Sequence, residues 1–284
     1  MTQAETSPDL LVVQNLCISF GGLKAVDDMS LSIRRGGISG LIGPNGAGKS
    51  TLFNLIAGYY RPNSGRVFLD GEDITGQSPH VLFGKGLLRT FQIAREFSTL
   101  TVRENLMMVP GEQTGETYLG ALLRPGRVRA EERALREKAD DILDFLQITH
   151  VADLPAGSLS GGQKKLLELG RTMMADPKII FLDEVGAGVN RTLLYTIADA
   201  IRRLNTERGY TFCLVEHDMQ FVSDLCDDVI CMAEGRLLAR GTVDRILSDE
   251  AVIAAYLGKG RAAKGTGLDG TIFGDTPPVK TGVA

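Results

Sequence analysis

The sequence contains no tryptophan, few cysteines and no long uninterrupted apolar segment. Its apolar stretches, such as Ile179–Leu182 and Val229–Ala233, are far shorter than the roughly 20 residues that a membrane-spanning helix needs. An excess of positive charge is also missing, because 31 Lys and Arg residues stand against 35 Asp and Glu residues, for a net charge of −4. This balance argues against binding to nucleic acid through bulk charge. We therefore expect a chain that does not cross a membrane and has no nucleic-acid partner.

The cysteine pattern lacks the features of a metal site, since no CxxC pair occurs and no nearby histidine completes a zinc set. The cysteines lie in or beside apolar segments, at Cys17, Cys213, Cys226 and Cys231. We expect them to be reduced residues of the core. The start of the chain also lacks the basic region of a secretory signal, because no Lys or Arg precedes Lys24. We therefore expect the protein in the cytoplasm.

The 284 residues, 43% of them hydrophobic, suffice for one large domain or two small ones. Apolar runs bounded by glycines predict strands over residues 10–20, 29–33 and 38–42, and a hairpin where residues 66–69 precede Asp70-Gly71. From residue 178 on, apolar runs alternate with helical patterns; the runs are 179–182, 211–215 and 229–233, and the helical patterns are 191–204 and 218–225. Short runs that are apolar on both faces are typical of a buried parallel sheet, so we expect an α/β fold.

The middle of the chain predicts helices alone. Thr101 and Glu104 form the pattern of a capping box, and apolar residues recur at helical spacing over 131–146, after a polar connection at 111–129. We expect an α-helical subdomain over approximately residues 93–175, inserted into a domain of residues 1–258. After Gly258 few core-forming residues remain, which predicts a disordered tail over 259–284, with a partner-binding segment as the alternative.

A glycine-rich loop follows the apolar run 38–42 and precedes a helix expected over 50–57. Its sequence, Gly43-Pro44-Asn45-Gly46-Ala47-Gly48-Lys49-Ser50, fits the phosphate-binding pattern between a strand and a helix. Glycines let backbone N–H groups face phosphate oxygens, and the helix N-terminus adds positive potential. We expect Lys49 to reach the β- and γ-phosphates and Ser50 to bind Mg²⁺, with Thr51 in the same nucleotide-binding stretch. The alternative is a glycine turn with an incidental lysine.

Two carboxylates, Asp183 and Glu184, end the apolar run that begins at Ile179. Open parallel sheets bind ligands at this end of their strands. Taken alone, such a pair is more often a strand entering a loop. With the phosphate loop upstream, we expect Asp183 to hold Mg²⁺ through its hydration shell, and Glu184 to orient and deprotonate the attacking water.

A second glycine-rich helix start occurs at Leu159-Ser160-Gly161-Gly162-Gln163. With Ser160 as N-cap, it is either another anion-binding helix terminus or simply a helix start. Lying between the phosphate loop and the Asp-Glu pair, this pentapeptide resembles the signature of the ATP-binding-cassette (ABC) ATPases. The resemblance spans about residues 10–258. It implies an α/β P-loop NTPase fold with a RecA-like core, an antiparallel β subdomain and an inserted α-helical subdomain, and it implies that Ser160, Gly161, Gly162 and Gln163 bind ATP.

The same resemblance assigns further site residues. Gln92, in Arg89-Thr90-Phe91-Gln92, matches the glutamine loop, which touches Mg²⁺ and senses the membrane partner. His217 matches the switch histidine that contacts the γ-phosphate, although without this context a histidine satisfied at a strand end is the simpler interpretation. Phe20 matches the aromatic residue that stacks on adenine, and an ordinary core Phe is equally compatible with its position.

Three positions depart from the common family pattern. Val185 stands where proline usually follows the catalytic glutamate, Gly37 where an acidic residue is frequent, and Asn190 where Asp is usual. Asn190 is itself seen in the amino-acid uptake branch. Val185 and Gly186 are expected to loosen the backbone that holds Glu184, and so to affect the turnover rate more than the reaction.

One phosphate loop and one signature imply half of a two-site assembly. In the family each ATP is clamped head to tail between two cassettes, so we expect an ATP-dependent dimer with an identical or related cassette. The implied cofactors are ATP and Mg²⁺. The implied partners are integral membrane permease subunits and, indirectly, a periplasmic substrate-binding protein. The implied location is peripheral, on the cytoplasmic face of the inner membrane.

Four segments resemble the ATPase subunits of branched-chain and other hydrophobic amino-acid importers: residues 86–92, 100–105, 121–125 and 255–258. Together they favour an ATPase that powers uptake of such amino acids. Cassettes for urea or amide uptake or for lipopolysaccharide export share much of the pattern and stay open as alternatives. A soluble nucleotide-gated clamp on DNA, RNA or the ribosome would predict tandem cassettes, a long coiled coil or a basic face, none of which the sequence contains. The sequence does not identify the transported compound.

Overall fold

The computed structural model describes residues 9–90, 96–111, 113–114, 123–186 and 190–261. Its strands are β1 Asp9–Phe20, β2 Leu23–Arg34, β3 Ile38–Ile42, β4 Ser64–Leu69, β5 Glu72–Asp73, β6 Leu87–Arg89, β7 Ile179–Asp183, β8 Thr211–Val215, β9 Asp228–Ala233 and β10 Arg236–Gly241. Its helices are α1 Lys49–Ile56, α2 Pro79–Gly84, α3 Val102–Met107, α5 Pro125–Phe145, α6 Gly161–Met174, α7 Arg191–Arg208, α8 Met219–Leu225, α9 Val243–Leu247 and α10 Glu250–Arg261. Within the described residues, no helix is long and apolar enough to span a bilayer.

A six-stranded sheet forms the centre of the described structure, in the order β10-β9-β3-β8-β7-β6. Its neighbouring strands pair in parallel, except that β10 pairs antiparallel with β9. Side chains along β7 alternate between two cores: Ile180 and Leu182 face one cluster, whereas Ile179 and Phe181 face the other. Both faces of the sheet are therefore buried, as the apolar runs predict.

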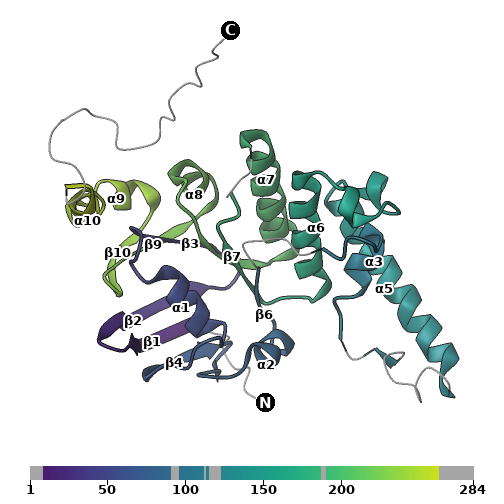
Figure 1. The fold of residues 1–284 in the computed structure, drawn as a ribbon, viewed down its shortest axis with the longest axis horizontal. Helices are drawn as coiled ribbons and strands as arrows, with labels where there is room; N and C mark the ends of the chain where they lie inside the picture. The colour runs from purple at the N-terminus through teal and green to yellow at the C-terminus, as the bar shows by residue number, and fades with distance from the viewer. Residues whose placement is uncertain (1–8, 91–95, 112, 115–122, 187–189, 262–284) are drawn as a thin grey trace, which may run out of the picture.

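A separate antiparallel sheet, in the order β2-β1-β4-β5, packs with α1 on one side of this core. The turn between β4 and β5 places Asp70 at φ 55° and Gly71 at φ 79°, the paired positive angles that a tight hairpin requires. The predicted hairpin is confirmed. Strand β2 begins at Leu23, earlier than the sequence pattern indicates. Figure 1 shows β1, β2 and β4 at the lower left of the molecule.

Helices α3, α5 and α6 pack against one another, and Figure 1 shows α3 and α5 at the right-hand end, away from the antiparallel sheet. Thr101 caps α3 in the expected capping box, because its side chain accepts from the Glu104 N–H and Glu104 bonds back to the Thr101 N–H. The prediction of a connection extending to residue 129 is wrong, since α5 begins at Pro125, where a proline fits the first turn of a helix. At the other end of the chain, α10 continues to Arg261, three residues into the tail expected over 259–284, and residues 262–284 lie outside the described residues.

Candidate functional site

The phosphate loop leaves the buried strand β3 and leads into α1. Gly43 has φ 148°, and a Cβ there would lie 2.0 Å from the Met232 carbonyl oxygen. Gly48 has φ 101°, and a Cβ there would lie 2.3 Å from the Ala25 carbonyl oxygen. Both positions therefore require glycine. Gly48 is also the N-cap of α1 and offers no side-chain hydrogen bond to it, so the loop supplies the kind of helix N-terminus that binds anions.

The side chain of Lys49 folds back over this loop. Its Nζ donates to the carbonyl oxygens of Gly43 at 2.6 Å and Pro44 at 3.2 Å. The side chain is buried, at 6% exposed. A buried ammonium group held by neutral carbonyl oxygens concentrates positive charge at the loop, which suits a phosphate group.

A cavity of about 590 Å³ opens beside the loop, within the size range of small-molecule sites. Its lining joins segments that are far apart in sequence: residues 23–25, 45–51, 184, 217 and 234–235. The structure thus brings the predicted phosphate loop together with Glu184 and His217. Strand β9 and its turn toward β10 add Glu234 and Gly235, which sequence reasoning did not single out.

Glu184 and His217 follow the adjacent parallel strands β7 and β8, which is why they meet at one edge of the sheet. His217 Nε2 lies 3.2 Å from Glu184 Oε1, and both side chains are partly exposed. Glu184 adopts a left-handed backbone conformation with φ 48°, which is uncommon for a residue other than glycine. Backbone strain of this kind is often found at functional sites.

Asp183 is buried, at 4% exposed, and its Oδ2 accepts from Arg89 Nη2 at 2.5 Å. Arg89, at the end of β6, also donates from Nη1 to Asn54 of α1. The other carboxylate oxygen, Oδ1, is buried without a hydrogen-bond partner. An unpaired buried carboxylate oxygen is a feature that a cation or its bound water would satisfy.

The signature segment lies at the start of α6, outside the lining of this cavity. Ser160 and Gln163 form a capping box: Ser160 Oγ accepts from the Gln163 N–H at 3.3 Å, and Gln163 Oε1 accepts from the Ser160 N–H at 2.9 Å. A Cβ at Gly161 would meet nothing within 4 Å, whereas a Cβ at Gly162 would meet Leu193 of α7 at 2.6 Å. The first glycine therefore faces open space, and the second allows close packing of two helices.

Two further predicted residues stand apart from the cavity lining. Phe20 is 47% exposed, and its ring packs edge to face on Tyr60 with centroids 5.3 Å apart. It is not the ordinary core Phe that its position also allowed. Gln92 lies outside the described residues, although the strand that precedes it, β6, ends at Arg89.

Comparisons with known proteins bear on this arrangement. A family model described as "ABC transporter" matches residues 26–187. The chain belongs to the ABC transporter family. A second model, described as "Branched-chain amino acid ATP-binding cassette transporter", matches residues 236–262 of the cassette, which span β10, α9 and α10.

Curated relatives of the cassette extend over almost its whole length. It is 41% identical to the probable branched-chain amino acid transport ATP-binding protein LivG of Archaeoglobus fulgidus, over 88% of this chain and 95% of the relative. It is 38% identical to the high-affinity branched-chain amino acid transport ATP-binding protein BraF of Pseudomonas aeruginosa, over 89% of this chain and 99% of the relative.

Solved structures agree with the fold. A nucleotide-free ATP-binding cassette from an ABC transporter superposes with a TM-score of 0.74 at 38% identity, covering 87% of this chain and 98% of that one. The ADP conformation of MJ1267, an ATP-binding cassette of an ABC transporter, gives a TM-score of 0.76 at 37% identity, covering 89% and 100%. The cassette therefore has the ABC nucleotide-binding fold, binds nucleotide and hydrolyses ATP.

Sequence reasoning missed one buried carboxylate of the cassette. Glu216 precedes His217 and is 5% exposed, and its Oε1 accepts from the Gly186 N–H at 3.0 Å. Burial raises the pKa of Glu216 above its usual range, and backbone hydrogen bonds from Gly186, His217 and Val185 oppose that shift. The sequence does contain a signal for this residue, because a glutamate directly follows the apolar run 211–215.

Proposed function

We propose that this cassette hydrolyses ATP in the cavity beside the phosphate loop, to drive uptake of branched-chain or other hydrophobic amino acids. The observation that carries the chemistry is that one cavity of about 590 Å³ is lined by residues 45–51, Glu184 and His217. The printed names of the relatives, which are branched-chain amino acid transport ATP-binding proteins, support the class of substrate.

Each residue of the cavity has a proposed part in this reaction. Residues 43–51 bind the phosphates through backbone N–H groups and the Lys49 ammonium. Glu184 orients and deprotonates the attacking water, and His217 contacts the γ-phosphate. The distance of 3.2 Å between His217 Nε2 and Glu184 Oε1 lets both side chains reach the same phosphate group.

Magnesium fits the residues that the chain offers. Asp183 has a buried carboxylate oxygen without a partner, and the Ser50 hydroxyl is exposed at the start of α1. Among the described residues no cluster of three His, Cys, Asp or Glu side chains could hold a metal ion alone. That donor set suits Mg²⁺, which keeps several waters and uses one or two protein ligands plus phosphates. We place it on Ser50, Asp183 and Gln92, where it would neutralise charge on the transferred phosphoryl group.

A second cassette completes the site in this proposal. Ser160–Gln163 lie outside the cavity lining of their own chain, and the backbone at Gly161 faces open space. We propose that this segment, together with the anion-binding N-terminus of α6, closes on ATP held by the partner cassette. Phe20 stacks on the adenine ring, for which its 47% exposure leaves room.

The transport role requires partners in the membrane. We propose that the cassette binds integral membrane permease subunits on the cytoplasmic face of the inner membrane, with a periplasmic substrate-binding protein acting indirectly. Purification of the tagged chain from gently solubilised membranes, followed by mass spectrometry, tests this. Permease subunits and a second cassette are the expected companions. Recovery of the chain alone, or with nucleic acid, would contradict the proposal.

The catalytic assignment has its own test. Lys49→Ala should abolish phosphate release because it removes the ammonium group from the phosphate loop. Glu184→Gln should reduce it to a small residual rate that single-turnover measurement detects, while ATP binding persists and traps a dimer that light scattering detects in saturating ATP and Mg²⁺. Arg66→Ala, at an exposed position on β4, is a control that should hydrolyse ATP at the normal rate. Unchanged phosphate release by Lys49→Ala would refute the assignment of the phosphate loop.

A further inference from the structure

The backbone that carries Glu184 is held on both sides by the end of β8. Upstream, the Glu184 N–H donates to the Val215 carbonyl oxygen at 3.0 Å. Downstream, the Gly186 N–H donates to Glu216 Oε1 at 3.0 Å. The left-handed conformation of Glu184, with φ 48°, lies between these two anchors. A strained residue persists only where its surroundings over-determine it, and these bonds provide that constraint.

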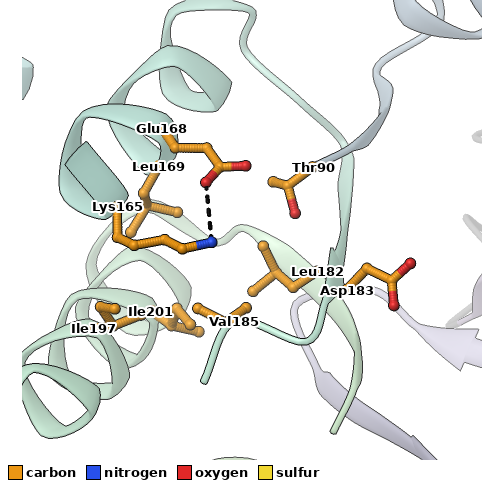
Figure 2. Close-up of a pocket in the computed structure, with 9 residues that line it drawn as sticks. All are labelled: Thr90, Lys165, Glu168, Leu169, Leu182, Asp183, Val185, Ile197 and Ile201. Carbon is orange, nitrogen blue, oxygen red and sulfur yellow. Dashed lines mark hydrogen bonds and ion pairs between the residues drawn. The ribbon is translucent and has the colours of Figure 1, made fainter. Parts of the chain in front are cut away.

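Val185 takes part in this anchoring through its side chain. That side chain is buried, and Figure 2 shows it beside Ile197 and Ile201 of α7, with the Asp183 carboxylate pointing away from them. The valine that departs from the common family pattern is therefore fixed by an apolar contact with α7.

Glu216 also connects this segment to His217. It directly precedes His217 in the chain, and His217 Nε2 lies 3.2 Å from Glu184 Oε1. One buried side chain next to His217 thus holds the backbone that follows Glu184.

We propose that Glu216 is a positioning residue for ATP hydrolysis, which holds Glu184 and His217 in register by binding the Gly186 backbone N–H from the position next to His217. This inference rests on the proposed role of Glu184. Glu216 is not among the residues that line the cavity, so it acts on the reaction through Glu184 and His217 and leaves nucleotide binding by the phosphate loop intact.

The test is a double-mutant cycle of Glu216→Gln with Glu184→Gln, measured by single-turnover hydrolysis of labelled ATP. Gln removes the negative charge and one of the two acceptor oxygens, which weakens the anchor at the Gly186 N–H. Glu216→Gln alone should lower kcat by about 10-fold or more, while the Kd for ATP changes less than about 3-fold. In the Glu184→Gln background it should cause no further loss, because residues that act as a unit are not additive.

The results that would contradict the positioning role of Glu216 differ from the result that would contradict the proposed function. An equal loss in both backgrounds, or an unchanged kcat in Glu216→Gln, would overturn the positioning role. Hydrolysis unaffected by Glu184→Gln would instead refute the proposed function on which it rests. Glu137→Gln, at an exposed position on α5, is the matched control and should behave as wild type. If circular dichroism shows that Glu216→Gln does not fold, Glu216→Asp keeps the charge with a shorter reach, and the same cycle should give a loss of about 3-fold that is again absent beside Glu184→Gln.

Discussion

At the scale of single residues, the carboxylate of Asp183 and the guanidinium of Arg89 are each held by specific partners. Asp183 is paired with Arg89 on one oxygen only, and Arg89 is in turn held by Asn54 and by the faces of Phe53 and Tyr59, each ring centroid 5.9 Å from its Cζ. The carboxylate is therefore oriented by Arg89 through Oδ2, while its buried Oδ1 has no hydrogen-bond partner. This pair also links β6, which precedes the position of Gln92, to β7, which carries the two carboxylates.

Removal of Arg89 should be costly for the fold. In Arg89→Met, Asp183 would remain buried without its partner, and such a change typically costs about 3–5 kcal/mol in the free energy of unfolding. The control is Arg66→Met, which breaks an exposed pair with Asp73 at 3.9 Å and should cost less than about 1 kcal/mol. Urea unfolding followed by circular dichroism measures both. Similar midpoints for the two variants would show that the buried pair contributes little.

At the scale of elements, α6 and α7 each begin after a residue whose side chain caps the helix. Asn190 caps α7, because its side-chain oxygen accepts from the Leu193 N–H at 2.9 Å. Asn and Asp are equally good N-caps, so this departure from the family pattern keeps the helix start intact. Leu193 also packs on Gly162, which joins the start of α7 to the start of α6.

The two signature glycines should therefore respond differently to alanine. Gly161→Ala meets open space and reduces the freedom of the unfolded chain, so it should raise the free energy of unfolding by about 0.5 kcal/mol. Gly162→Ala pushes Leu193 from α7 and should lower it by about 1 kcal/mol. Chemical unfolding of both variants without nucleotide provides the comparison. A larger loss for Gly161→Ala than for Gly162→Ala would contradict the packing.

At the scale of the whole molecule, the central sheet separates two hydrophobic cores, and its buried strands contribute thiols to both of them. Cys213 faces one core and Cys231 the other, and the cysteines are free. Two of the four, Cys17 and Cys226, are only half-buried, so the expectation of core cysteines holds fully for Cys213 and Cys231. Burial raises the pKa of Cys226 to about 12 and of Cys231 to about 11, and it raises the pKa of Cys213 as well.

These thiols should make the fold sensitive to alkali. In the unfolded chain a thiol loses its proton near its ordinary pKa of 9.0, whereas Cys231 in the folded state keeps its proton up to about pH 11. The stabilising contribution is therefore complete below pH 9 and is lost as the pH rises, by up to about 1.4 kcal/mol per pH unit for each thiol. Urea unfolding by circular dichroism between pH 8 and 11 should show this decline. Cys231→Ala should show a shallower one, and an identical slope would exclude the thiol as its source.

The sequence by itself determined the local chemistry and much of the order of elements. The phosphate loop, the Asp183-Glu184 pair, the capping box at Thr101 and the N-cap at Ser160 are short-range patterns, because glycine conformation, strand burial and caps depend on neighbours in sequence. The parallel sheet followed from runs that are apolar on both faces, and the hairpin from Asp70-Gly71. The edge strands β6 and β10 were not foreseen, since β6 is only three residues long and β10 is partly exposed.

Only the tertiary structure decided which distant groups meet. The pairing of β7 with β8 brings Glu184 to His217. The same pairing lets Glu216 accept a hydrogen bond from the Gly186 N–H. The pairing of β6 with β7 brings Arg89 to Asp183. The expectation that Val185 and Gly186 loosen the backbone stays a prediction, and it was made without Glu216, because a hydrogen bond across 30 residues has no local signature. Distances between strands depend on register and burial over the whole sheet, which no single segment of sequence contains.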